Sequence, residues 1–265
     1  NNHRTERKTQ SIGLLSVFIW CKGGEIRNME ATPKVVEIFG LSFSVPILIS
    51  CGVSVLLIAL FTIFASRKVS MKPGKLQNAL EALMDFTKGI VNSAVDEKTA
   101  QTYYLYIFSL FSFVLVANMV GLIIFIHYED HSYFASPTAS PIVCLALALM
   151  TTLIAHYSGV QKMGLKGYIQ HSYLSPMSIM LPIKLIEEFT NTITLAFRLY
   201  GNIYAGEVLL GLIVMFSSAA GLITYILAIP LGVVWQGFSV VIGAIQAYVF
   251  CTLTMVYISH KVMKH

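Results

Sequence analysis

Residues 46–65 read PILISCGVSVLLIALFTIFA, an apolar run that contains no charged side chain. An α-helix rises ~1.5 Å per residue, so a run of this length spans the ~30 Å hydrocarbon core of a bilayer. Lipid offers no hydrogen-bond partner to an open sheet edge, so such a segment crosses as a helix. The run ends at Arg67 and Lys68, and basic residues beside a span are typical of its cytoplasmic end. This stretch therefore predicts a membrane-spanning helix.

The remainder of the chain has the same apolar character. Of its 265 residues, 56% are hydrophobic and 12% are charged, whereas soluble domains contain about 25% charged residues. Further spans are predicted at residues 103–127, 138–157, 182–214 and 222–258. Residues 73–95 instead separate apolar and charged side chains onto two helix faces, which indicates an amphipathic helix at the membrane interface. We predict an all-α polytopic membrane protein with about five membrane-crossing helices and one amphipathic interfacial helix.

The last two predicted helices are longer than a bilayer requires. Residues 182–214 extend ~50 Å as a helix, against a hydrocarbon core of ~30 Å. Such helices must tilt strongly, bend or lie partly along the membrane. We expect both to tilt strongly and Pro230 to bend the last one. A steeply tilted helix pair suggests a surface that embraces something curved.

Basic residues also predict the orientation of the chain. Like Arg67, the lysines that follow the third and fifth predicted spans mark a cytoplasmic side: Lys162, Lys166, Lys261 and Lys264. Five crossings then put the N-terminus outside and the C-terminus in the cytoplasm. Residues 1–34 are basic on the supposed outer side, which conflicts with this orientation. We therefore expect residues 1–28 to be a non-native or mis-started, disordered leader, with either Met29 as the start or the leader removed. Residues 29–265 are expected to form a single integral-membrane domain.

One predicted span carries a charge near its middle. Residues 195–207 read LAFRLYGNIYAGE, and Arg198 lies among apolar residues there. Placing a guanidinium at the centre of a bilayer costs about 2.5 to 3.5 kcal/mol. Helical spacing puts four polar side chains on the same face: Glu187, Asn191, Thr194 and Asn202. An apolar helix therefore carries one polar stripe, with Glu188 beside its inner end and Glu207 near its outer end.

The last predicted helix offers a matching stripe: Ser239, Gln246 and Tyr257. If residues 236–258 cross the membrane, Gln246 is expected at mid-depth, level with Arg198. Ser239 is then expected near Glu207, and Tyr257 near the inner end.

Structural pairing of polar residues between helices is the alternative explanation. It stays open for Ser239, Asn191 and Thr194, but it explains a fixed cation less well, because intramembrane charges mark a water-filled path or a counter-charge. Arginine stays protonated, so it repels cations and attracts carboxylates but does not relay a proton by titrating. The arrangement resembles two half-paths separated by an electrostatic barrier. A partner must then supply the mobile carboxylate that carries protons past it.

Two stretches carry a family resemblance: LPIKLIEEFTNTITLAFRLYGNIYAGEVLLGLI (181–213) and IQAYVFCTLTMVYISH (245–260). They resemble subunit a of F-type ATP synthases, in the form found in Firmicutes, and the resemblance covers residues 29–265. It implies a non-catalytic stator subunit of the membrane (Fo) sector. Such a subunit passes protons between two half-channels and the carboxylates of a c-ring, which couples proton translocation to rotation and ATP synthesis.

The resemblance also assigns roles to individual residues. Arg198 corresponds to the essential arginine of the family, which meets the c-ring carboxylate, and Gln246 to the glutamine that faces it. Glu207 corresponds to the glutamate of the outer half-channel, and Asn202 lies in the same motif. The inner half-channel is implied near Glu188, Thr194 and Tyr257. Some members have a histidine where this chain has Ser239, so water or Ser239 itself must serve there.

The implied partners are the c-ring, subunit b of the peripheral stalk, the remainder of the F-type ATP synthase and the lipid bilayer, with protons as the transported ion. The implied location is the bacterial plasma membrane. No cofactor or metal is expected. The net charge of +5 does not indicate nucleic acid, because the basic residues lie at helix ends.

Two other classes of function remain open from the sequence. A stand-alone ion channel or secondary transporter would conduct ions by itself and typically contains internal repeats, of which no convincing one is evident. A membrane-embedded enzyme needs a reactive motif, but the seven histidines show no HExxH pattern. The histidines cluster at predicted membrane ends, where we expect solvated side chains.

Overall fold

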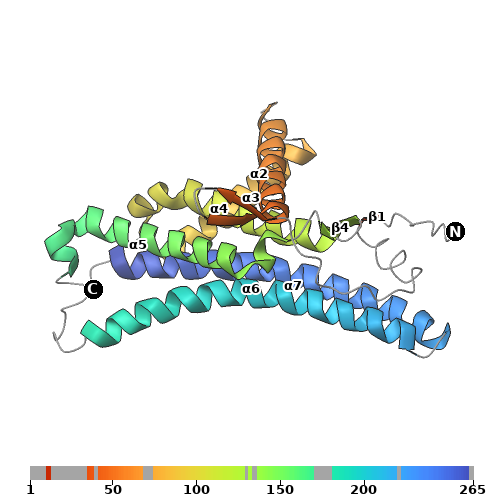
Figure 1. Cartoon of the computed structure of the whole chain (residues 1–265). Coiled ribbons are helices and arrows are strands. Elements are labelled where there is room, and N and C mark those ends of the chain that lie inside the picture. The colour runs from red at the N-terminus through yellow and green to blue at the C-terminus, as the bar shows by residue number, and fades with distance from the viewer. Residues whose placement is uncertain are drawn as a thin grey trace. The chain divides into compact units, whose positions relative to one another are not determined.

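The computed structural model describes residues 10–12, 35–38, 41–67, 74–128, 131–132, 136–169, 181–219 and 222–262. Its helices follow one another along the chain (Figure 1): α2 Val45–Ser66, α3 Lys75–Asn92, α4 Glu97–Ile123, α5 Pro141–Ile169, α6 Leu181–Ala219 and α7 Leu222–Val262. A short 3-10 helix, η1 Pro137–Ala139, precedes α5. Helices dominate the described chain, which confirms the predicted all-α class.

Five of these helices are long and apolar enough to cross a membrane, as predicted: Val45–Ser66, Glu97–Leu122, Pro141–Tyr168, Leu181–Ser217 and Thr224–Val262. The predicted amphipathic helix is α3. The last two helices are longer still than expected, with 39 residues in α6 and 41 in α7. At ~1.5 Å per residue, each extends about 60 Å, twice the thickness of a hydrocarbon core. Their strong tilt stays a prediction.

Short strands accompany the helices. β2 Val35–Ile38 pairs antiparallel with β3 Leu41–Ser44. β4 Ile124–Tyr128 pairs with β1 Gln10–Ile12 on one side and with β5 His131–Ser132 on the other. The span predicted at 103–127 therefore ended too late. Its last residues, 124–127, belong to β4, whose sequence IFIHY is rich in the β-branched and aromatic types that favour a strand. β1 lies within the predicted leader, whose other residues fall outside the described part of the chain.

The chain divides into two compact units. The first unit comprises residues 1–57, 115–140 and 201–244, and the second comprises residues 58–114, 141–200 and 245–265. Helices α2, α4, α6 and α7 each contribute one segment to each unit.

Polar side chains join α4 to α7 inside the first unit. The buried Asn118 donates from Nδ2 to the Gly243 carbonyl at 3.0 Å, and its Oδ1 accepts from Thr138 at 2.9 Å. Gln236 Nε2 donates to the Leu122 carbonyl at 2.6 Å. These amides satisfy backbone oxygens of a neighbouring helix, which is how helices associate where lipid offers no hydrophobic driving force.

The second unit is built on an apolar interior. Its fully buried side chains include Ile107, Leu195, Leu199, Phe250 and Met255, which come from α4, α6 and α7. Helix α3 contributes Ile90 and Val91, which are buried as its predicted apolar face requires. Leu76, at the start of the same face, is 57% exposed.

Helix α5 is interrupted at Gly164, where φ is +73° and ψ is 160°. Side chains other than glycine rarely adopt this conformation, so a residue without Cβ is required there. Beyond the break, Tyr168 is buried and packs on Gly159, where an added Cβ would lie 2.6 Å from the tyrosine ring. Helix α5 therefore extends well past the predicted end at residue 157, and the Tyr168 ring packs back against Gly159 of the same helix.

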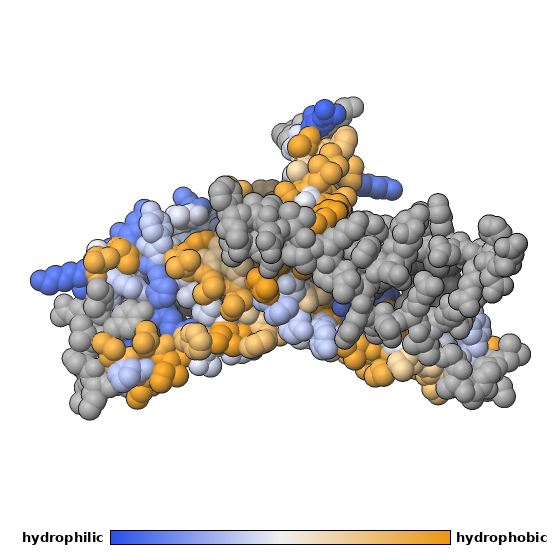
Figure 2. All heavy atoms as spheres, viewed as in Figure 1, coloured by the Kyte–Doolittle hydropathy of each residue, from blue (hydrophilic) through white to orange (hydrophobic). Residues whose placement is uncertain are grey.

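Apolar side chains cover much of the visible surface of α2 and α6 (Figure 2). Along α2, the leucine, valine and phenylalanine side chains at positions 48, 55, 56 and 64 are about half exposed. On α6, Phe189 and Phe197 are 68% and 60% exposed. Exposed apolar patches of this kind are typical of surfaces covered by lipid or by another membrane subunit.

Candidate functional site

The polar stripe predicted on one helix lies on α6. Glu187, Thr194 and Arg198 are exposed, whereas Asn191 and Asn202 are partly exposed. The intervening Leu195 and Leu199 point the other way, because both are fully buried in the second unit. A period of 3.6 residues thus separates one polar, accessible face from one buried apolar face.

Arg198 is an exposed cation on the polar face of α6. Among the residues that the structure describes, no carboxylate or hydrogen-bond acceptor contacts its guanidinium. Its neighbour Phe197 is 60% exposed, so the guanidinium lies on an accessible face flanked by an aromatic ring. The guanidinium is therefore accessible to an anion on another molecule.

Two amides that the sequence placed near this arginine have buried nitrogens. Gln246 is 7% exposed, and its Nε2 has no hydrogen-bond partner within the described chain; the same is true of Asn202 Nδ2. Leaving a buried donor unpaired costs about 1–3 kcal/mol, so both nitrogens are places where water or another subunit can bind. Gln246 and Arg198 belong to the same unit, but no contact between their side chains is found there. Their predicted facing stays a prediction.

At the other predicted end of the stripe, in the first unit, Glu207 is partly exposed. Within the described ranges, no ion pair or hydrogen bond holds its carboxylate. Helix α7 approaches α6 closely at Gly206, the residue before Glu207. Trp235 Nε1 donates to the Gly206 carbonyl at 3.1 Å, and the buried Ser239 hydroxyl lies 3.4 Å from where a Cβ on Gly206 would stand. Ser239 is therefore next to the residue that precedes Glu207, without a direct contact to the carboxylate.

Glu188 is in the opposite situation. Lys261 Nζ lies 2.8 Å from Oε1 and 3.1 Å from Oε2 of this carboxylate. His156 Nε2 lies 3.1 Å from Oε1, and His156 Nδ1 is hydrogen-bonded to the Tyr168 hydroxyl. We call these four residues the Glu188 network. Tyr257 and Thr194, predicted near Glu188, show no direct contact with its side chain in the described residues.

The histidine and the lysine of this network were not recognised from the sequence. The expectation of a solvated histidine is wrong for His156, whose side chain is 25% exposed and engaged at both ring nitrogens. Lys261 was assigned to the membrane flank, yet its side chain is only 18% exposed. No sequence spacing links positions on three different helices, so only the fold brings them together.

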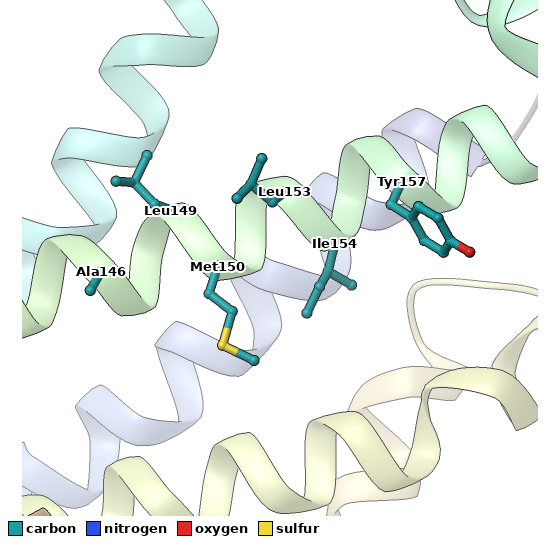
Figure 3. A pocket seen from close by; sticks show the side chains of 6 residues that line it. All are labelled: Ala146, Leu149, Met150, Leu153, Ile154 and Tyr157. Carbon is teal, nitrogen blue, oxygen red and sulfur yellow. The ribbon is translucent and has the colours of Figure 1, made fainter.

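Helix α5 also borders a shallow apolar hollow of about 450 Å³. Figure 3 shows its lining: Ala146, Leu149, Met150, Leu153, Ile154 and Tyr157. The lining contains one hydroxyl group and no charge, so it is unsuited to ion transfer. In the described part of the chain, no group of three or more histidine, cysteine or acidic residues is placed to hold a metal ion.

Comparison with known proteins decides the family. A family model described as ATP synthase A chain matches residues 47–259. The chain belongs to the ATP synthase subunit a family. It is 48% identical to the ATP synthase subunit a of Pediococcus pentosaceus over 226 residues, which cover 85% of this chain and 95% of that protein. It is 43% identical to subunit a of Listeria monocytogenes and of Enterococcus faecalis, in each case over 88% of this chain and 98% of the relative.

Membership confirms the resemblance seen in the sequence. A member of the subunit a family is a proton-translocating subunit of the Fo membrane sector and a non-catalytic part of the F-type ATP synthase complex. With its five apolar helices, the chain is a multi-pass bacterial membrane protein. The alternatives of a stand-alone channel and of a membrane enzyme lose their support.

Proposed function

We propose that this subunit a passes protons through two half-channels that are separated by Arg198, to and from carboxylates on a ring of c subunits. The observation that supports this is the state of Arg198 itself. It is an exposed cation that has no anion among the described residues and is flanked by an exposed aromatic ring. A charge in this position is costly beside lipid, and a carboxylate on a moving partner removes that cost.

The permanent charge of arginine explains both parts of the proposed role. A guanidinium is not deprotonated in proteins, so it cannot hand a proton across. It stabilises a carboxylate that has released its proton and repels protons that would pass straight between the half-channels. Each proton that crosses a potential of 100 mV is worth about 2.3 kcal/mol. That energy is available for rotation only if protons do not slip past the barrier.

The two half-channels are proposed at opposite ends of the stripe. Glu207 belongs to the outer one, together with Asn202 and Ser239. The inner one is proposed around Glu188, Thr194 and Tyr257, and Gln246 is proposed to face the arginine. With the N-terminus outside and the C-terminus in the cytoplasm, the Glu188 network lies at the cytoplasmic end. The unpaired amide nitrogens of Asn202 and Gln246 support a path that holds water.

The proposed partners follow from the same surfaces. The c-ring is proposed to cover the face of α6 that exposes Phe189, Phe197 and Arg198. Subunit b of the peripheral stalk is the second proposed partner within the complex. An intact complex in which the residue opposite Arg198 is visible tests the first assignment directly.

Replacement of Arg198 by alanine tests the proposed mechanism. We expect Arg198→Ala to abolish ATP-driven proton pumping by membrane vesicles, because nothing then stabilises the deprotonated carboxylate or blocks leakage. The complex should still assemble, since the guanidinium has no described partner within the chain. Arg67→Ala is the matched control, because it removes an exposed guanidinium at the end of α2, a helix that carries none of the stripe residues. Normal pumping by the Arg198 variant would contradict the mechanism.

A further inference from the structure

The Glu188 network gathers side chains from three helices of one unit. Glu188 comes from α6, Lys261 from the last turn of α7, and His156 from α5. Tyr168 reaches the histidine from beyond the break at Gly164, and the two rings meet edge to face at 86° with centroids 6.0 Å apart. The Lys261 ammonium also lies 5.8 Å from the centre of the tyrosine ring. Each member therefore contacts at least two others.

Within this network, the carboxylate is already occupied. Lys261 contacts both oxygens of Glu188, and both side chains are about four-fifths buried, at 19% and 18% exposure. Charge-assisted contacts of this length are among the stronger polar interactions in proteins. A proton that settled on Glu188 would have to displace a bound ammonium. Glu188 is thus placed as a counter-ion rather than as a resting place for a proton.

The histidine has no such restriction. Its Nε2 faces a Glu188 oxygen, and its Nδ1 faces the Tyr168 hydroxyl, which can donate or accept a hydrogen bond. In the neutral ring, Nε2–H donates to Glu188, and the tyrosine O–H donates to Nδ1. After one proton is added at Nδ1, N–H donates to the tyrosine oxygen instead. The ring can therefore hold one proton or two while every heavy atom stays in place.

We propose that His156 is the proton-carrying residue at the Glu188 end of this subunit, with Glu188 as its counter-charge and Tyr168 as its reversible hydrogen-bond partner. This rests on the proposed function, in which protons move through the chain. The step is the binding of one proton from water at Nδ1 and its later release to water. Glu188 stays a carboxylate and Lys261 an ammonium throughout. Among the described residues, these two groups and Tyr168 are the titratable groups that face the ring from α6, α7 and the end of α5.

A purely structural role for His156 makes a different prediction. One helical turn away, Thr152 of α5 and Thr192 of α6 join the same two helices through their hydroxyl oxygens, 3.0 Å apart. Thr192 also donates to the Glu188 carbonyl. This pair holds the helices together without any group that changes charge. Thr152 is therefore a matched control, because its replacement weakens the same interface and removes no proton carrier.

The experiment uses the assembled ATP synthase in membrane vesicles and measures ATP-driven proton pumping between about pH 6 and 8, where histidine normally changes charge. In His156→Gln, an amide N–H can still donate to Glu188, but the side chain takes up no proton. We expect pumping at least about tenfold below wild type, as for loss of an acid–base group, with a flatter dependence on pH. Thr152→Val should pump at a rate near wild type with an unchanged pH profile.

Three results would overturn the proposal: normal pumping by His156→Gln, an equal loss in Thr152→Val, or an unchanged pH profile in a slowed His156→Gln enzyme. Tyr168→Phe carries the test if His156→Gln does not assemble, because it keeps the ring on Gly159 and removes only the hydroxyl. An altered pH profile supports the proposal there, and a wild-type profile overturns it. Arg198→Ala distinguishes failure of the proposed function from failure of the His156 proposal. If Arg198→Ala abolishes pumping while His156→Gln pumps normally, only the His156 proposal fails.

Discussion

Two of the three carboxylates on helix α6, those of Glu188 and Glu207, have contrasting surroundings. Glu188 holds a lysine and a histidine and is largely shielded from solvent. Glu207 has no ionic or hydrogen-bonded partner among the residues that the structure describes. The difference separates two purposes for acidic residues on one helix. Glu188, tied to an ammonium, joins α6 to α7, whereas Glu207 is the carboxylate that the proposed function requires to bind and release protons.

The contacts between α6 and α7 repeat this difference. In the second unit, the ion pair of Glu188 and Lys261 joins the two helices. In the first unit, the neutral hydrogen bond from Trp235 to the Gly206 carbonyl joins them. Removing Lys261 from the ionic contact leaves a poorly solvated carboxylate without its ammonium, whereas removing the neutral hydrogen bond of Trp235 leaves no charge uncompensated. Lys261→Met and Trp235→Phe test this contrast, and Glu207→Gln tests the contrast between the two carboxylates. The largest effect is expected for Lys261→Met and the smallest for Trp235→Phe.

Lys261→Met should have the largest effect on stability. It removes the Lys261 ammonium from a Glu188 carboxylate that is mostly buried, and we expect a loss of about 2–3 kcal/mol. Thermal melting of the solubilised complex measures this loss. Lys162→Met is the matched control, because Lys162 is exposed on α5 and should change the melting temperature little. Equal shifts for the two variants would show that the Glu188 network adds no stability.

Glu207→Gln should act on function rather than on stability. If the unpaired carboxylate carries protons, the amide should slow ATP-driven pumping about tenfold, which corresponds to about 1.4 kcal/mol in activation free energy. The amount of assembled complex should stay the same, because no described partner loses a contact. Glu97→Gln, at the exposed first turn of α4, controls for loss of a negative charge. Unchanged pumping would remove Glu207 from the proton path.

Trp235→Phe should have the smallest of the three effects. It keeps an aromatic ring and removes one neutral hydrogen bond to Gly206, which is worth about 1 kcal/mol. Melting of the solubilised complex again provides the measurement. Tyr104→Phe, which removes an exposed hydrogen bond to Asn92, should shift the melting temperature less. A larger shift for Trp235→Phe than for Lys261→Met would reverse the proposed order of ionic and neutral contacts.

The number of spans, the helical class and the family could all be predicted from the sequence. Apolar runs must cross lipid as helices, and the stretch around Arg198 carries a long specific pattern. The strand β4 was missed because hydropathy does not distinguish a short strand from the end of an apolar helix. The break at Gly164 was missed because a glycine in the sequence does not reveal whether the helix continues or is interrupted there. The proton-path residues proposed around Arg198 stay predictions.

The Glu188 network was beyond sequence reasoning for a different reason. His156, Glu188 and Lys261 are separated by 32 and 73 positions along the chain, so no local period joins them. Each has an ordinary explanation when taken alone: a histidine at a membrane end, one of two adjacent glutamates, and a lysine on a cytoplasmic flank. Only tertiary contacts show that the three neutralise and orient one another.

The positive φ angle at Gly164 limits which amino acids can replace this residue during evolution. Nothing lies within 4 Å of the place where a side chain would stand at this position, so packing alone would rate it as freely variable. A non-glycine residue would nevertheless carry about 1–3 kcal/mol of backbone strain there. The backbone torsion at Gly164 thus sets the direction of the chain that carries Tyr168, four residues later. A substitution at Gly164 would therefore displace the Tyr168 hydroxyl, although the two residues make no side-chain contact.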